Sequence, residues 1–378
     1  MRARSSNGPG IATRVFGSQW FVSVLAVLIA FVIGAILIAL SGASVVDAYY
    51  AMFRGSIVDP NAANGVRMIK PLTDSLFYSI PLIISGLGLA LGFRAGLFNI
   101  GGKGQIIVGA LAAVWVGFSV NLPPVHTLVA LLVAVVAGGL YGGIAGILKA
   151  KTGANEVIVT IMLNSIATLG LGYTLAQKAW QVPGTNQPVT PKVAESAALA
   201  RLLPAPFKLH VGFLVALVAL VAFWWLIERS TLGFQIRAVG ANAAAARTAG
   251  ISVERITAIT MVISGAFLGL AGANEALGTI GYVSRDVAGS IGFDAITVAL
   301  LGRNKTWGTF GAGLLFGAFK AGGYTMQAKG VPIDMILILQ SVIVLLIAAP
   351  ALVRWLFRLP DVRALAANTR KGNADEHK

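Results

Sequence analysis

The chain has 378 residues, of which 57% are hydrophobic and 11% are charged, and its mean hydropathy is +0.82. Soluble domains carry about 25% charged residues, so this composition excludes an ordinary water-soluble globular protein. The sequence has no cysteine, which excludes disulfides, thiolate metal sites and cysteine nucleophiles. Its three histidines lie far apart, so no metal site is expected.

The first apolar run, residues 20–40, contains no charge and can cross the roughly 30 Å hydrocarbon layer as one helix. A secretory signal has a shorter apolar core of roughly 7–15 residues, so this run is interpreted as a retained anchor. The later apolar runs are 72–93, 106–120, 126–147, 157–175, 210–227, 256–273, 291–301, 308–325 and 333–352. The fold class predicted is therefore an all-α polytopic membrane protein with about ten transmembrane helices. The run at 291–301 is too short to span alone, so it is either a half-helix or extends back toward Ala288.

The net charge of +15 comes mostly from basic residues at the ends of apolar runs. This distribution is typical of membrane orientation signals rather than of a nucleic-acid surface, and it predicts that both termini are inside (N-in/C-in). The expected domains are a cytoplasmic N-terminal segment 1–19, a transmembrane domain 20–354 and a basic cytoplasmic tail 355–378. Within the transmembrane domain we expect an outside loop at about 176–209 and an inside loop at about 228–255.

Glycines recur at four-residue spacing in several apolar runs, as at Gly138, Gly142 and Gly146. Such stripes let helix backbones approach closely in a bilayer, so packing is the preferred interpretation. ISGLGLALGF at 84–93 resembles ISGAFLGLAG at 263–272, and the two segments run in opposite directions in the ten-span interpretation. This similarity, although weak in such a composition, suggests an inverted repeat, the architecture that places a substrate path at the repeat interface in many transporters.

A glycine-rich turn, GLFNIGGKGQ, occupies residues 96–105. It is not a P-loop, because Leu97 and Gly104 stand where that motif needs glycine and a hydroxyl. Two interpretations are open: an ordinary inside turn between two spans, or a broken helix whose backbone lines a cavity. The residues that define it are Asn99, Gly101, Gly102, Gly104 and Gln105. In the second case the polar amides serve a neutral, hydroxyl-rich solute.

A second polar pair lies in GANEVIVTIMLNSIA at 153–167, where Glu156 and Asn164 share nearly the same helical face. Glu156 is interpreted as a structural charge at a helix N-terminus. Asn164 is assigned to the path or to packing, because polar side chains inside a membrane are costly. Asp74, Asn274, Glu275 and Asp294 lie near predicted span ends. No catalytic set emerges from these residues.

The inside loop contains an alanine-rich core, Ala241–Ala249, with Gly240 before it and Gly250 in a stop position. Alanine is the strongest helix former, so the sequence predicts a short exposed helix. Such a helix has no apolar stripe of its own to bury. It therefore needs something to pack against.

GLFNIGGKGQ, GANEVIVTIMLN and RAVGANAAAARTAGI together resemble the permease subunits of ATP-binding-cassette importers for simple sugars and nucleosides, over about residues 70–350. The NEVIVTIMLN variant is more similar to the nucleoside branch. The resemblance implies that the alanine-rich loop is the coupling helix that docks on a separate ATPase. Its coupling residues would be Arg237, Gly240, Asn242, Ala246, Arg247 and Gly250.

On this interpretation the chain is a transport subunit, not an enzyme, of a bacterial cell (inner) membrane. It is expected to bind no cofactor, with ATP on the partner subunit, and to form the translocation path by alternating access, lined by Asn99, Gln105 and Asn164. The implied partners are the ATPase, a second permease (heterodimer favoured over homodimer), an external solute-binding protein and membrane lipid. An ion-coupled secondary transporter using Asp74, Glu156 or Glu275 is the alternative.

Overall fold

The computed structural model describes residues 19–328 and, beyond them, 330–332, 335, 337, 338, 341, 342, 345 and 346. The chain forms two compact units, one of residues 1–50 with 326–378 and the other of residues 51–325. The expected terminal segments 1–19 and 355–378 lie, apart from Gln19, outside the described residues, as does most of the run 333–352. The second unit contains all of the sites considered below.

The described part of the chain is helical, and within it no β-strand forms beyond an isolated bridge between Arg201 and His210. Every expected apolar run up to residue 325 coincides with a helix. The helices are α2 (Gln19–Leu40), α3 (Val45–Ser56), α4 (Gly65–Arg94), α5 (Gly102–Ser119), α6 (His126–Thr152), α7 (Glu156–Ala176), η1 (Lys178–Trp180), α8 (Gly212–Arg229), α9 (Thr231–Ala241), α10 (Ala243–Thr248), α11 (Val253–Asn274), η2 (Glu275–Ile280), α12 (Ile291–Leu301) and α13 (Thr306–Gln327).

Six helical segments among the described residues are long and apolar enough to cross a membrane: 65–94, 102–119, 126–152, 156–176, 212–229 and 253–280. The all-α membrane class is therefore confirmed, whereas the count of about ten spans and the N-in/C-in topology stay predictions. The short run at 291–301 forms the 11-residue helix α12, which begins at Ile291 and not at Ala288. Of the two interpretations of this run, the structure shows the half-helix and not the extension toward Ala288.

Close glycine contacts join α6 to α11, as the glycine spacing predicts. A Cβ atom on Gly138 would lie 2.5 Å from the Gly265 carbonyl oxygen, and one on Gly142 would lie 2.6 Å from that of Met261. Real side chains do not fit at such distances, so the two backbones can meet only where glycine stands. The packing interpretation of the stripe is confirmed.

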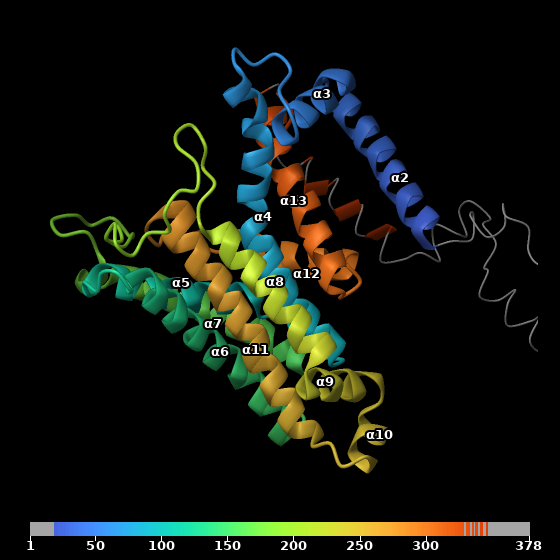
Figure 1. The fold of residues 1–378 in the computed structure, drawn as a ribbon, viewed down its shortest axis with the longest axis vertical. Helices are drawn as coiled ribbons and strands as arrows, with labels where there is room; N and C mark the ends of the chain where they lie inside the picture. The colour runs from blue at the N-terminus through green and yellow to red at the C-terminus, as the bar shows by residue number, and fades with distance from the viewer. Residues whose placement is uncertain are drawn as a thin grey trace, which may run out of the picture. The chain divides into compact units, whose positions relative to one another are not determined.

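The two similar segments, 84–93 and 263–272, lie on α4 and α11, and these helices run in opposite directions in the second unit (Figure 1). They also contact each other, because a Cβ on Gly88 would lie 2.9 Å from the Ser264 carbonyl oxygen. Helix α4 is the central element of this unit, and its residues 79–92 are all buried. The inverted repeat itself stays a prediction.

The long loop between α7 and α8 packs onto the neighbouring loops instead of hanging free. The Thr190 N–H donates to the Val283 carbonyl (3.0 Å), and the Leu199 N–H donates to the Leu277 carbonyl (3.1 Å). Trp180 stacks on Trp115 with ring centroids 4.7 Å apart. These contacts form an ordered cap at the end of the second unit that lies opposite α9 and α10 (Figure 1).

Candidate functional site: the α9–α10 surface and the glycine turn

The alanine-rich segment is split into two helices, not formed as the single helix that alanine propensity predicts. Helix α9 begins at its cap Ser230, whose hydroxyl accepts the Gly233 N–H (2.9 Å), and it ends at Ala241. Asn242 then adopts an extended backbone and caps α10, because its Oδ1 accepts the Ala245 N–H (3.0 Å). An asparagine side chain that accepts from the following turn favours a new helix start over continuation. This competition explains the break.

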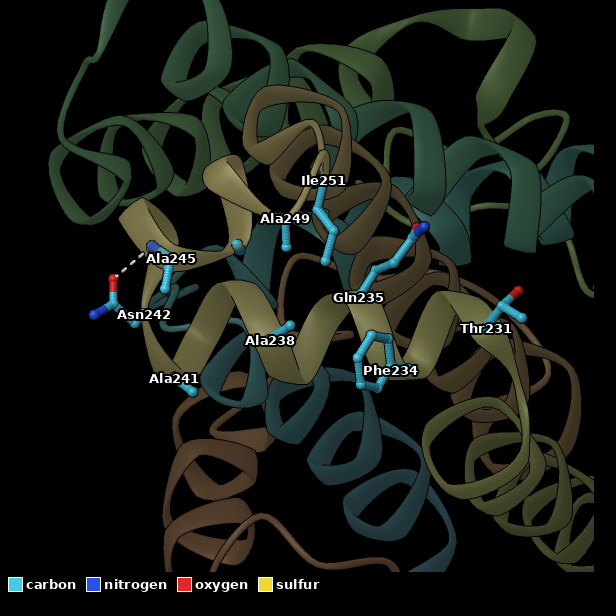
Figure 2. A pocket seen from close by; sticks show the side chains of 10 residues that line it. Thr231, Phe234, Gln235, Ala238, Ala241, Asn242, Ala245, Ala249 and Ile251 are labelled. Atoms are coloured by element: carbon cyan, nitrogen blue, oxygen red, sulfur yellow. Dashed lines mark hydrogen bonds between the residues drawn. The ribbon is translucent and has the colours of Figure 1, made fainter.

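An apolar groove of about 570 Å³ lies between these two helices (Figure 2). Phe234, Ala238 and Ala241 line it from α9, while Ala249 and Ile251 line it beyond α10. The alanines leave the hollow because their side chains stop at Cβ, and exposed Phe234 stands beside it. Ala246, one of the expected coupling residues, is buried and also lines the groove.

The remaining expected coupling residues take distinct positions around the groove. Arg247 forms an ion pair of 2.6 Å with Glu254, and its side chain is 66% exposed. Arg237 lies 3.9 Å from Glu228, at the limit of an ion pair. Gly250 has a φ of +82°, which glycine adopts without strain, and it ends α10 as predicted. Arg247 is therefore the expected coupling residue that most clearly presents charge to solvent.

Gly240 connects α9 to the end of α4. A Cβ at this position would lie 2.0 Å from the Arg94 carbonyl oxygen, so a residue with a side chain cannot occupy it without displacing α9. Arg94 also donates from Nε to the Asn304 carbonyl (2.7 Å), in the turn between α12 and α13. Close contacts thus join α9 to the end of α4, and through Arg94 to the α12–α13 turn.

The glycine turn joins α4 to α5, and it is mostly buried, with only Gly96 and Phe98 exposed among its residues. Asn99 is fully buried; its Nδ2 donates to Gln105 Oε1 (3.1 Å) and to Ser264 Oγ (3.0 Å). Its Oδ1 accepts from the Gly101 N–H (2.9 Å) and from Gln105 Nε2 (3.3 Å). Gly101 precedes α5, and Gly102 and Gly104 lie in its first turn.

Asn164 joins the turn to α7. Its Nδ2 donates to the Ile100 carbonyl (2.8 Å), and its Oδ1 accepts the Gly104 N–H (2.8 Å). The Thr160 hydroxyl accepts the Ile100 N–H (3.2 Å). The three expected path residues, Asn99, Gln105 and Asn164, therefore meet at one turn, where they hydrogen-bond each other or its backbone. Their role as path lining stays a prediction.

Glu156 takes the structural role expected of it. Its carboxylate pairs with Lys149 at 2.9 Å and accepts the Phe98 N–H at 3.5 Å, so it ties the start of α7 to α6 and to the glycine turn. Asp74 likewise pairs with Lys70, one helical turn earlier on α4. Two of the three acidic residues considered for ion coupling thus have lysine partners.

The sequence interpretation missed Ser264, Arg94 and Lys320. Ser264 lies 165 residues from its partner Asn99, and no local pattern could relate the two. Lys320 did give a signal, because it is a lysine inside the apolar run 308–325, and an ionisable residue in a span indicates function.

Comparison with known proteins identifies the family of this chain. The family model described as "Branched-chain amino acid transport system / permease component" matches residues 72–348. The chain belongs to this family. It is a permease subunit of an ATP-binding-cassette importer, a transport component of a bacterial cell membrane that crosses the bilayer several times.

The family members most informative about this permease cover nearly its whole length. It is 40% identical to the guanosine ABC transporter permease protein NupP of Bacillus subtilis over 89% of this chain and 95% of that protein. It is 35% identical to the glucose ABC transporter permease protein TsgB13 of Haloferax volcanii over 85% of each chain. It is 30% identical to the nucleoside ABC transporter permease protein NupB of Lactococcus lactis, over 92% of this chain and 95% of that protein. No solved structure gives a significant match.

Proposed function

We propose that this permease moves a nucleoside, driven by ATP that a separate cytoplasmic ATPase subunit binds and hydrolyses. The observation that carries the proposal is the α9–α10 groove, an apolar hollow at one end of the helix bundle with an exposed arginine beside it. Such a surface suits a partner that inserts apolar side chains and places a carboxylate against Arg247. The chain itself then needs no nucleotide site.

Coupling follows from the contacts between elements. A partner that moves α9 moves α4, because Gly240 lies against Arg94, and it moves the α12–α13 turn through Asn304. This rigid connection supports alternating access by movement of helices against one another. The amide cluster of Asn99, Gln105 and Asn164 lies beside this connection, where it keeps the α4–α5 turn rigid or meets the solute.

The choice of nucleoside over simple sugar rests on the relatives. NupP and NupB carry guanosine and nucleoside in their names, although TsgB13 carries glucose. A heterodimer with a second permease is favoured, because Bacillus subtilis and Lactococcus lactis each have a second, different match, NupQ and NupC. The packed loops opposite α9 and α10 are the proposed contact for an external solute-binding protein.

Uptake into proteoliposomes tests the proposal. The permease, purified with its associated subunits and supplied with solute-binding protein, is expected to accumulate tritiated guanosine only when ATP is available to the ATPase. A matched preparation with glucose in place of guanosine tests the solute. Accumulation that follows an imposed ion gradient and ignores ATP would support an ion-coupled carrier instead.

A further inference from the structure

Three ionisable side chains from three helical segments meet inside the helix bundle, apart from the α9–α10 surface. Lys320 of α13 lies 3.4 Å from Asp294 of α12, and Asp294 also accepts a hydrogen bond from the Ser290 hydroxyl (2.7 Å). Glu275, the first residue of η2, lies close enough to Lys320 to feel its charge. The Lys320–Asp294 ion pair thus has a second carboxylate nearby.

Two tyrosines lie at the same level of the bundle. Tyr78 of α4 and Tyr324 of α13 have ring centroids 5.3 Å apart. Helices α4 and α13 pack closely near these tyrosines, because a Cβ on Gly317 would lie 2.5 Å from the Ser75 carbonyl oxygen. Tyr78 is sixteen residues along α4 from Arg94, about 24 Å at the helical rise of 1.5 Å per residue. The cluster thus lies far from the α9–α10 surface.

Part of this cluster is exposed at the surface of the chain. Charged side chains rarely face lipid, so this exposure needs an explanation. Lys320 keeps 29% of its side chain exposed, and Tyr324 is 46% exposed. By contrast, helices α6, α7 and α8 expose apolar side chains such as Leu140, Leu169 and Val218, as expected of surfaces that contact lipid. An accessible charge between membrane-spanning helices belongs on a water-filled path or at an interface with protein.

The backbone at this point is also unusual. Residues 275–280 form a π-helical turn that continues α11, and Glu275 is its first residue. Single π turns occur frequently at functional sites, because they re-aim a side chain relative to the regular helix. The change from α-helical to π-helical geometry therefore falls at Glu275 itself.

The chemistry selects a solute class. Aromatic faces stack on nucleobases, carboxylates accept from base N–H and ribose hydroxyl groups, and an ammonium donates to carbonyl oxygens. Two carboxylates against one ammonium repel a phosphate group. A neutral solute with a flat ring and several donors fits the cluster better than a nucleotide or an aliphatic sugar.

The geometry points to the Tyr78–Glu275–Asp294–Lys320–Tyr324 cluster as the site at which the permease binds a neutral nucleoside during translocation. This inference rests on the proposed function for its solute and places that solute on residues of this chain. It assigns the glycine-turn amides to holding the helices and the cluster to contacting the solute.

Equilibrium binding of tritiated guanosine to the purified transporter in detergent, without ATP, tests the site separately from transport. Saturable binding is expected, with about tenfold weaker affinity in Tyr324→Leu, the loss that base–aromatic stacking supplies. Lys320→Met is expected to weaken binding as well. The double variant Lys320→Met with Asp294→Asn leaves no unpaired charge at Asp294, and it should also bind guanosine more weakly than the wild type. Guanosine 5′-monophosphate and glucose should compete poorly.

Matched controls are Tyr173→Leu, an exposed tyrosine on α7, and Lys149→Met, which breaks an ion pair elsewhere. Both should bind guanosine as the wild type does. Absence of saturable binding, or equal affinity in wild type, Tyr324→Leu and Lys320→Met, would overturn the site. ATP-driven uptake by the same preparation tests the proposed function independently: binding without uptake would contradict the function and leave the site standing.

Discussion

At the scale of single residues, two positions are tightly constrained by their surroundings, Gly240 by close packing and Asn99 by hydrogen bonds. Gly240 allows two backbones to touch, and Asn99 uses all its polar atoms inside the protein. A substitution at either position therefore removes or displaces a specific contact, with a predictable effect.

Gly240→Val should separate α9 from α4, because its Cβ would lie 2.0 Å from the Arg94 carbonyl oxygen. The expected result is a transporter that still folds but loses most ATP-driven uptake, measured in proteoliposomes. The matched control is Gly170→Val on α7, where a Cβ meets nothing within 4 Å. Normal uptake by Gly240→Val would show that α9 and α4 do not transmit the movement.

Asn99→Leu removes a buried amide and leaves polar groups of Gln105, Ser264 and Gly101 without their partner. Such a loss costs about 1–3 kcal/mol for each unsatisfied group, so the thermal midpoint of unfolding should fall clearly. Gln187→Ala, in an exposed part of the α7–α8 loop, is the control and should change little. An unchanged midpoint for Asn99→Leu would mean that water or a solute replaces the lost contacts.

His210 predicts a pH dependence of stability outside the spans. Burial lowers the pKa of His210 to about 4, while its Nδ1 accepts the Gly212 N–H (3.1 Å). The unfolded chain binds a proton near pH 6.5 and the folded chain does not, so stability falls as the pH drops from 6.5 toward 4. The loss should reach about 2 kcal/mol at pH 5. Thermal unfolding of His210→Gln should show a shallower decline over this window, and parallel curves would contradict the assignment.

At the scale of elements, the apolar runs predicted the helices well because each run is long and uninterrupted. The sequence also predicted the α6–α11 glycine contact, since small residues at four-residue spacing define a face. It failed at Asn242, where the alanines on both sides favour one helix and only the cap geometry reveals two. It could not predict the Asn99–Ser264 contact or the Lys320–Asp294 pair, because both depend on how separate helices pack.

The α9–α10 element makes its own prediction through Arg247. Both side chains of its pair with Glu254 are exposed to solvent, so the pair adds little stability and removing it should not unfold the chain. Arg247→Glu should nevertheless reduce copurification of the ATPase by about tenfold or more, because a reversed charge repels the docking partner.

The charge swap Arg247→Glu with Glu254→Arg separates docking from folding. It restores the ion pair but keeps the wrong charge on α10. If Arg247 contacts the partner, the swap should assemble as poorly as the single variant. If the arginine only supports the local fold, the swap should recover normal assembly.

At the scale of the whole molecule, the proposed ATPase-facing surface and the proposed solute site lie about 24 Å apart along α4. The membrane class and the family follow from the apolar helices and from the match over residues 72–348. The solute and the second permease depend on partner chains, so both are proposals that rest on the relatives.

Affinity purification of the intact chain from its native membrane in mild detergent tests the central claim most directly. We expect an ATP-binding-cassette ATPase to copurify in stoichiometric amount, together with a second, different permease. Arg247→Glu should reduce the amount of ATPase recovered. Recovery of the chain alone, with the α9–α10 surface intact, would contradict the claim that this surface couples the permease to ATP.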